Sequence, residues 1–258
     1  MELDLWLLAL LIASANAVQV IVGFGASMLT LTIASLFAPI DALLPLLVPL
    51  NLGTPIYLAA RYRGAVDTQL LLRQMIPLGL VGLALGFALF LVIDGAALTL
   101  AYGLFVVGLS GLRLTAALRE RTRLPAPTAD AAADAATASR APAPSRLWLV
   151  AGGLCHGLFA TGGPVLVLYT AAVLTDKQRF RCTMAGLWIP LNAALLTGYA
   201  LKGSLTPTTL ETSARLAPAL LVGVVAGEFV HRRLSQSGFN ILVYSLILFA
   251  GVLLLAGG

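Results

Sequence analysis

Charged residues are scarce in this chain. They make up 10% of its 258 residues, while 59% are hydrophobic, and a soluble domain carries about 25% charged residues. The composition therefore excludes an ordinary soluble domain and predicts a polytopic membrane protein. The net charge of +5 comes from arginines between the apolar stretches, so nucleic-acid binding has no support.

Cysteine is almost absent too. The chain has two cysteines, Cys155 and Cys182, both in the second half, which excludes a disulfide framework and a zinc-binding spacing. Carboxylates such as Asp41, Asp94 and Glu228 fall at or near the ends of apolar stretches. Without an acidic pair in mid-membrane, a sodium site or a carboxylate proton relay is poorly supported. We expect no cofactor and no metal.

Long hydrophobic stretches are plentiful instead. They cover residues 3–37, 43–60, 75–93, 96–114, 147–174, 183–201, 214–230 and 239–257. Most match the ~20 residues of a spanning helix, but the first and fifth are too long for one span and too short for two. These two carry glycine clusters, and glycine with proline interrupts a helix. We predict a re-entrant hairpin, broken at its glycines, in each.

The two halves read as copies of each other. A shift of 141 positions superimposes five helix-breaking or polar residues, Pro49, Asn51, Pro77, Gly82 and Gly86, on Pro190, Asn192, Pro218, Gly223 and Gly227. Paired helix breaks in the two halves of a membrane protein point to a transport site. The expected units are a first membrane repeat at 1–118, a flexible linker at 119–146 and a second membrane repeat at 147–258.

The positions of the basic residues predict the topology. Eight spans would divide the 16 basic residues 11 to 5. If the first and fifth stretches are hairpins, only Lys202 and Arg215 lie opposite the other fourteen, and the positive-inside rule prefers this arrangement. Three spans then remain in each half, so the two repeats are inverted. Both termini are predicted to be periplasmic and the linker cytoplasmic.

The residues at the hairpin centres are the first candidates for substrate binding. A helix that starts in mid-membrane exposes unpaired N–H groups and about half a positive charge, and glycine lets an oxyanion approach them. The candidates are Gly23, Phe24, Gly25 and Ser27 in the first hairpin and Thr161, Gly162 and Gly163 in the second. Close helix packing is the other explanation for the glycines, and helix capping for the two hydroxyls. Valine at Gly25 or Gly162 is expected to block the donors and leave the fold largely assembled.

Three polar residues in apolar helices complete the predicted site. Asn51 and Asn192 are paired by the repeat, and a buried amide must find a partner; each either donates to an anion or caps a hairpin tip. His156 is an ionisable group inside the membrane, able to bind an oxyanion or carry a proton, or else a neutral histidine bonded to a backbone carbonyl. Asn16 and Gln19 lie at a comparable depth in the first hairpin.

Four short segments carry a family resemblance: Val22-Gly-Phe-Gly-Ala-Ser27, Gly157-Leu-Phe-Ala-Thr-Gly-Gly-Pro164, Arg63-Gly64 and Lys202-Gly203. With them, nearly the whole chain resembles the sulfite exporter TauE/SafE family of membrane proteins, also called TSUP. The resemblance implies a bacterial inner-membrane carrier of sulfite, another sulfur oxyanion or an organosulfonate. We therefore expect an all-α polytopic membrane protein, not an enzyme, whose partners are the lipid bilayer and a small anion; assembly as a homodimer is left open.

Other classes of function remain as alternatives. A membrane thiol–disulfide relay, or a thiol-dependent carrier of a sulfur compound, would use Cys155 and Cys182. A relay, however, would be expected to place one cysteine in each repeat. An intramembrane hydrolase lacks paired carboxylates and an H-E-x-x-H motif. A purely structural subunit leaves the twin glycine clusters unexplained.

Overall fold

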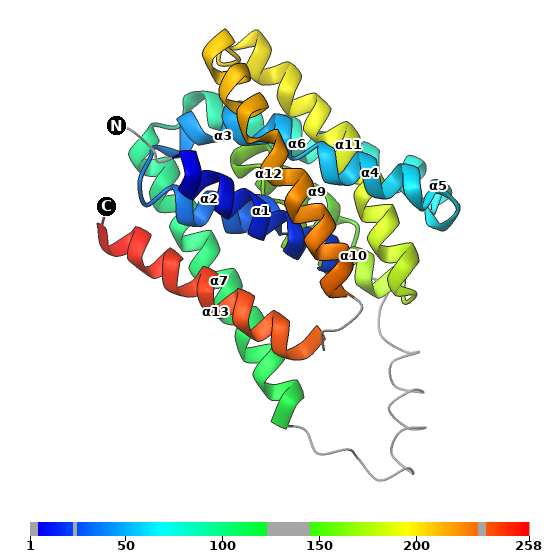
Figure 1. Cartoon of the computed structure of the whole chain (residues 1–258). Helices are drawn as coiled ribbons and strands as arrows, with labels where there is room; N and C mark the ends of the chain where they lie inside the picture. The colour runs from blue at the N-terminus through cyan, green and yellow to red at the C-terminus, as the bar shows by residue number, and fades with distance from the viewer. Residues whose placement is uncertain (1–4, 23–24, 123–144, 232–235, 258) are drawn as a thin grey trace, which may run out of the picture.

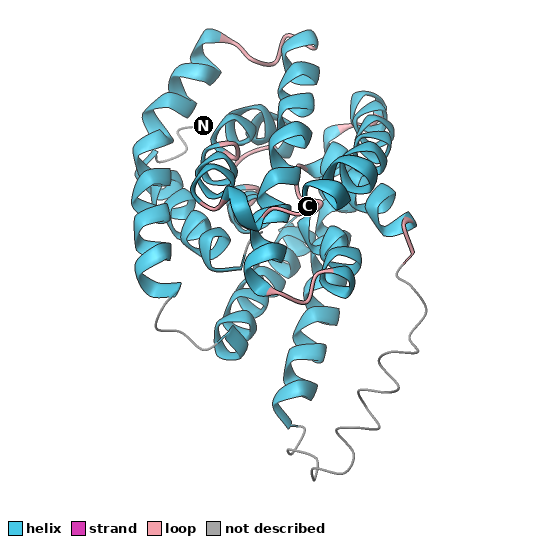
Figure 2. Ribbon diagram, turned by 90° about the vertical axis from the view of Figure 1, so that its right-hand side faces the viewer, coloured by secondary structure: helices cyan, strands magenta, loops and turns pink. Residues whose placement is uncertain are grey.

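The computed structural model describes residues 5–22, 25–122, 145–231 and 236–257. Within these ranges the regular structure is entirely helical, joined by short loops (Figure 2). Five helical stretches are long and apolar enough to cross a membrane: Ile40–Arg61, Thr68–Val92, Gly95–Thr115, Lys177–Leu201 and Pro207–Phe229. The predicted all-α, polytopic class is therefore confirmed.

The first half forms helices α1 to α7. Their bounds are α1 Leu5–Val22, α2 Ala26–Ala34, α3 Ile40–Leu50, α4 Gly53–Arg61, a 3₁₀ turn Arg63–Ala65, α5 Thr68–Leu70, a π-helical turn Leu71–Met75, α6 Ile76–Val92 and α7 Gly95–Thr122. The first apolar stretch is thus split into α1 and α2 around its glycines. Gly23 and Phe24 lie outside the described residues, and Gly25 precedes α2.

The second half repeats the order of the longer helices, without the short turns between α4 and α6. Its helices are α9 Leu147–Phe159, α10 Gly163–Val173, α11 Lys177–Leu201, α12 Pro207–His231 and α13 Gln236–Gly257. The fifth apolar stretch is split into α9 and α10, again at its glycines. By contrast α11 is one continuous helix, whereas the corresponding stretch of the first half is interrupted between α3 and α4.

Proline explains this interruption. A helix through Asn51 would need the N–H of residue 55 to donate to the Asn51 carbonyl, and Pro55 has no N–H. Pro55 lies instead in the first turn of α4, where proline is well tolerated. The second half has Leu196 at the equivalent position, so α11 continues past Asn192 despite Pro190.

The largest helix contacts pair elements from different halves. α6 packs on α9, α1 packs on α12, and α7 packs on α13, the last pair lying together along one side of the molecule (Figure 1). Under the shift that relates the halves, α6 corresponds to α12 and α1 to α9. The α6–α9 and α1–α12 contacts therefore correspond to each other. The α7–α13 contact joins two helices that are themselves counterparts in the two halves.

Glycines hold these helices at close range. A Cβ atom on Gly82 of α6 would lie 1.9 Å from the Val150 carbonyl oxygen of α9, and one on Gly223 of α12 would lie 2.2 Å from the Ala13 oxygen of α1. Small residues at such crossings let membrane helices approach closely enough to gain van der Waals contact. The matched glycines of α6 and α12 therefore serve helix packing.

The packing also corrects the register of the repeat. Gly82 and Gly223 differ by 141, but their partners Val150 and Ala13 differ by 137. The two hairpins thus superimpose with an offset of 137 residues, and the helices that follow them superimpose with an offset of 141. The difference of four residues is about one helical turn. In this register Gly25 corresponds to Gly162.

Candidate functional site

The two hairpin tips break differently. In the first, Gly25 precedes α2 with φ of 106°, a left-handed conformation that glycine adopts without the strain of a side chain. In the second, Ala160 ends α9 with φ of 53°, and Gly162 and Gly163 begin α10. Each tip thus presents the start of a short second helix.

A small cavity of about 20 Å³ lies between these tips. Its walls come from both hairpins, from the end of α3 at Asn51, and from α11 at Asn192. The lining residues are Gln19, Gly25, Ser27, Met28, Asn51, His156, Ala160, Thr161, Gly163, Pro164, Trp188 and Asn192. The fold therefore brings seven of the sequence-predicted site residues together: Gly25, Ser27, Asn51, His156, Thr161, Gly163 and Asn192.

The other three predicted residues are Gly23, Phe24 and Gly162. Gly23 and Phe24 lie outside the described residues. Gly162 packs behind the tip, where a Cβ atom would lie 2.1 Å from the Gly152 carbonyl oxygen and 2.9 Å from His156 Cβ. The expectation that valine at Gly162 leaves the fold assembled is therefore wrong, because a side chain there collides with the backbone of α9.

Four buried polar atoms on the cavity residues have no hydrogen-bond partner in the structure. They are Asn51 Nδ2, His156 Nε2, Thr161 Oγ1 and Asn192 Oδ1. Buried polar atoms are nearly always paired, because leaving one unpaired costs about 1–3 kcal/mol. Four such atoms on one cavity, contributed by both halves, are suited to a small polar ligand.

The two hairpins each contribute one long polar side chain. Gln19 lies six residues before Gly25, His156 lies six residues before Gly162, and both are buried and line the cavity. Asn16 has a structural role instead, since its side chain accepts a hydrogen bond from Thr54 at 2.7 Å. Gln19 is thus the polar counterpart of His156.

Sequence reasoning did not select the apolar wall of the site. The Trp188 ring lies 5.3 Å from the His156 ring, centroid to centroid, and Trp188 stands one turn before Asn192 on α11. Met28, Ala160 and Pro164 complete this wall. The one-turn spacing from Asn192 was the signal for Trp188, because residues four apart share a helix face.

Charge is kept out of the cavity. None of its lining residues is Lys, Arg, Asp or Glu, although Arg113 of α7 donates from Nη2 to the Pro164 carbonyl at 3.0 Å. Among the described residues, no group of three or more His, Cys, Asp or Glu side chains could hold a metal ion. The available positive potential comes mainly from the starts of α2 and α10.

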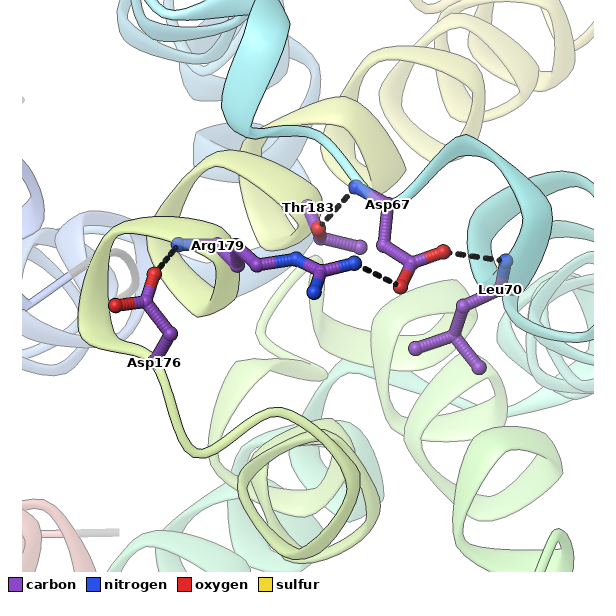
Figure 3. A network of polar contacts seen from close by, with 5 residues as sticks. All are labelled: Asp67, Leu70, Asp176, Arg179 and Thr183. Carbon is purple, nitrogen blue, oxygen red and sulfur yellow. Dashed lines mark hydrogen bonds and ion pairs between the residues drawn. The ribbon is translucent and has the colours of Figure 1, made fainter.

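A second polar cluster joins the halves elsewhere. Figure 3 shows Asp67, between α4 and α5, accepting a hydrogen bond from the Leu70 N–H and pairing with Arg179 at the start of α11. The Asp67 N–H donates to Thr183 Oγ1 at 2.9 Å, and Asp176 caps α11 by accepting from the Arg179 N–H. Nearby in sequence, the buried Arg181 pairs with Glu228 of α12.

A family model matches residues 7–254, nearly the whole chain, and its description is sulfite exporter TauE/SafE. The chain belongs to the TauE/SafE family. No curated protein and no solved structure matches it significantly. Membership identifies a membrane transporter for sulfite-type anions, in agreement with the helices long enough to cross a membrane. The family gives no support to the thiol–disulfide relay.

Proposed function

We propose that this TauE/SafE protein exports sulfite or a related sulfur-containing anion across the bacterial inner membrane, and that the anion binds in the cavity between the hairpin tips. One observation carries the proposal: unpaired polar atoms from both halves converge on a cavity without charged lining residues. The proposed site includes Gly23, Phe24 and Gly162, which neighbour the lining residues in sequence.

The physical chemistry of the site favours reversible binding. Helix starts and amide or hydroxyl donors attract an anion, while a permanent buried lysine or arginine would bind it more tightly and be costly in the membrane. A membrane potential that is negative inside favours the exit of an anion by ~2.3 kcal/mol per charge per 100 mV. Export along this gradient needs no intramembrane carboxylate.

We further propose that the halves are inverted repeats, at 1–118 and 147–258, joined by a cytoplasmic linker at 119–146. The equivalent contacts of α1 with α12 and of α9 with α6 support a twofold relation. The pairing of Arg179 with Asp67 supports hairpins that enter and leave on one side, and this topology makes both termini periplasmic.

The free thiols fit the carrier better than the relay. Cys155 is half-buried on α9 and Cys182 is buried on α11. Neither lines the cavity, and no third thiol exists in the chain. A small buried cysteine usually serves as an apolar packing residue.

Calorimetry on purified protein with a panel of sulfur oxyanions tests the proposal. We expect sulfite to bind, and Asn51→Leu to weaken binding about tenfold or more, because it removes a cavity donor. Thr197→Val is the control, because Thr197 is exposed on α11 and its hydroxyl bonds only to the Ala193 carbonyl one turn earlier. Equal sulfite affinities of the Asn51→Leu and Thr197→Val variants would contradict the proposal that the anion binds in this cavity.

A further inference from the structure

We propose that this cavity selects a singly charged oxyanion that retains one hydroxyl proton, of the hydrogen sulfite type, over dianions and over sulfonates. The inference rests on the proposed function, since it concerns the protonation state of the anion bound in the same cavity. Two features carry it: a fixed acceptor among the donors, and a positive potential that matches a single charge.

The acceptor is Asn192 Oδ1. The Asn192 Nδ2 donates to the Trp188 carbonyl at 2.9 Å. A carbonyl oxygen only accepts, so the NH₂ group must occupy that side of the amide, which fixes the orientation of Oδ1. Oδ1 is buried without a hydrogen-bond partner on a residue that lines the cavity. An amide oxygen that faces a bound anion is repelled unless the anion carries a proton to donate.

A donor stands beside this acceptor. The Gly162 N–H points at His156 Nδ1 across 3.5 Å, so Nδ1 is the acceptor and a neutral ring carries its proton on Nε2. His156 and Asn192 are near enough to interact, but the geometry of Nε2 and Oδ1 falls short of a hydrogen bond. His156 Nε2 can therefore donate to an oxygen of the ligand, while the neighbouring Asn192 Oδ1 can accept from a hydroxyl group of the same ligand.

The remaining donors complete the match. Asn51 Nδ2 and Thr161 Oγ1 are buried and unpaired on the same cavity. The hydroxyl of a hydrogen sulfite ion, HO–SO₂⁻, would donate a hydrogen bond to Asn192 Oδ1, and its other oxygens would accept from Asn51, Thr161 and His156. Methanesulfonate and sulfate have only acceptor oxygens, so either would leave Oδ1 opposite a negative oxygen.

The charge of the site points the same way. Each helix start supplies about half a positive charge, so α2 and α10 together supply at most about one unit, which the negative ends of α1 and α9 at the same tips reduce. The cavity lining contains no charged residue, and His156 is its one titratable group. Arg113 bonds to the Pro164 carbonyl rather than lining the cavity. Because desolvation cost rises steeply with charge, a dianion is compensated less well than a monoanion.

Calorimetric titration of the purified protein under anaerobic conditions tests this inference, with sodium sulfite, sodium methanesulfonate and sodium sulfate as probes at a series of pH values. Sulfite passes from monoanion to dianion near neutral pH, whereas methanesulfonate is a monoanion throughout. Both experience any titration of His156, so the ratio of their affinities isolates the protonation of the ligand.

We expect sulfite to bind at least about tenfold more tightly than methanesulfonate or sulfate where the monoanion prevails. Above the sulfite ionisation this preference should fall by about tenfold per pH unit. Sulfite binding with no preference over methanesulfonate, or with a preference independent of pH, overturns the inference and leaves the proposed function standing. Absence of binding by every probe overturns the proposed function itself.

Asn192→Leu assigns the preference to its residue. The variant keeps the size of the side chain and removes Oδ1, and we expect its sulfite and methanesulfonate affinities to become equal at the pH values where sulfite is a monoanion. Thr197→Val, five residues further along α11, should retain the wild-type preference. A full preference in folded Asn192→Leu overturns the assignment to Oδ1.

Discussion

Arg179 and Asp67 form an ion pair between the two halves, with Arg179 Nη2 2.9 Å from Asp67 Oδ2 (Figure 3). Asp67 follows the stretch Ile40–Arg61, and Arg179 lies in the first turn of α11. If all eight apolar stretches crossed the membrane, these two residues would lie on opposite faces. Hairpins in the first and fifth stretches would place them on the same face, in agreement with this contact.

The first prediction concerns this shared face. In a background with Cys155→Ala and Cys182→Ala, single cysteines at Asp67 and Arg179 should react with a membrane-impermeant maleimide only from the cytoplasmic side. A cysteine at Lys202, one of the two basic residues placed opposite, should react only from the periplasm. Labelling of the Asp67 and Arg179 positions from opposite sides contradicts the hairpin topology.

Much of the site was predictable because it depends on helix breaks. Glycine and proline interrupt helices wherever they stand, so the tips at Gly25 and Gly163 could be located from sequence, and the repeat then placed Asn51 and Asn192 together. The role of Gly162 could not be foreseen, because its contact with Gly152 depends on the packing of α9 against α10. In helices that are apolar all round, sequence periodicity does not show which face lines a cavity.

Two further features were missed by the sequence analysis for different reasons. Arg113 looked like a determinant of topology, but it reaches the Pro164 carbonyl at a hairpin tip. The interruption between α3 and α4 follows from Pro55, which the repeat comparison passed over because its counterpart is a leucine. Comparison of the two repeats identifies the residues that they share, but it does not reveal features that are present in one repeat alone.

The second prediction concerns the buried ion pair. Arg181 is 6% exposed and Glu228 is 25% exposed, with Nη2 2.7 Å from Oε1. Glu228→Gln leaves the guanidinium without a counter-charge, and we expect a cost of about 3 kcal/mol in stability. Asp67→Asn, which keeps its capping oxygen and opposes the exposed Arg179, should cost under about 1 kcal/mol. Thermal unfolding in detergent measures both, and equal losses contradict the argument from burial.

The third prediction concerns the thiols. Replacement of Cys155 and Cys182 together by alanine should retain transport, because neither residue lines the cavity. Sulfite efflux from proteoliposomes containing equal amounts of folded protein provides the measurement. Complete loss of efflux in the double variant would show that a thiol takes part in transport and would favour the thiol–disulfide relay.

The last prediction separates the two glycines that occupy corresponding positions in the hairpins. A Cβ atom on Gly25 has room, since its nearest neighbour is Val18 Cγ1 at 4.0 Å, but φ of 106° is strained for any residue with a side chain. Gly25→Ala should therefore fold with a loss of about 1–2 kcal/mol. Its methyl group lies on a lining residue, so sulfite affinity should fall as the approach of the anion to the α2 start is narrowed.

Gly162→Ala should behave in the opposite manner. Its Cβ would lie 2.1 Å from a backbone oxygen of α9, a contact that no change of rotamer relieves, so the variant should fail to yield folded protein or lose well over 3 kcal/mol. Size-exclusion chromatography and thermal unfolding in detergent compare the two variants, and calorimetry follows on Gly25→Ala. A stable Gly162→Ala with unchanged affinity would contradict the packing role, whereas unchanged affinity in Gly25→Ala would remove the first hairpin tip from the anion site.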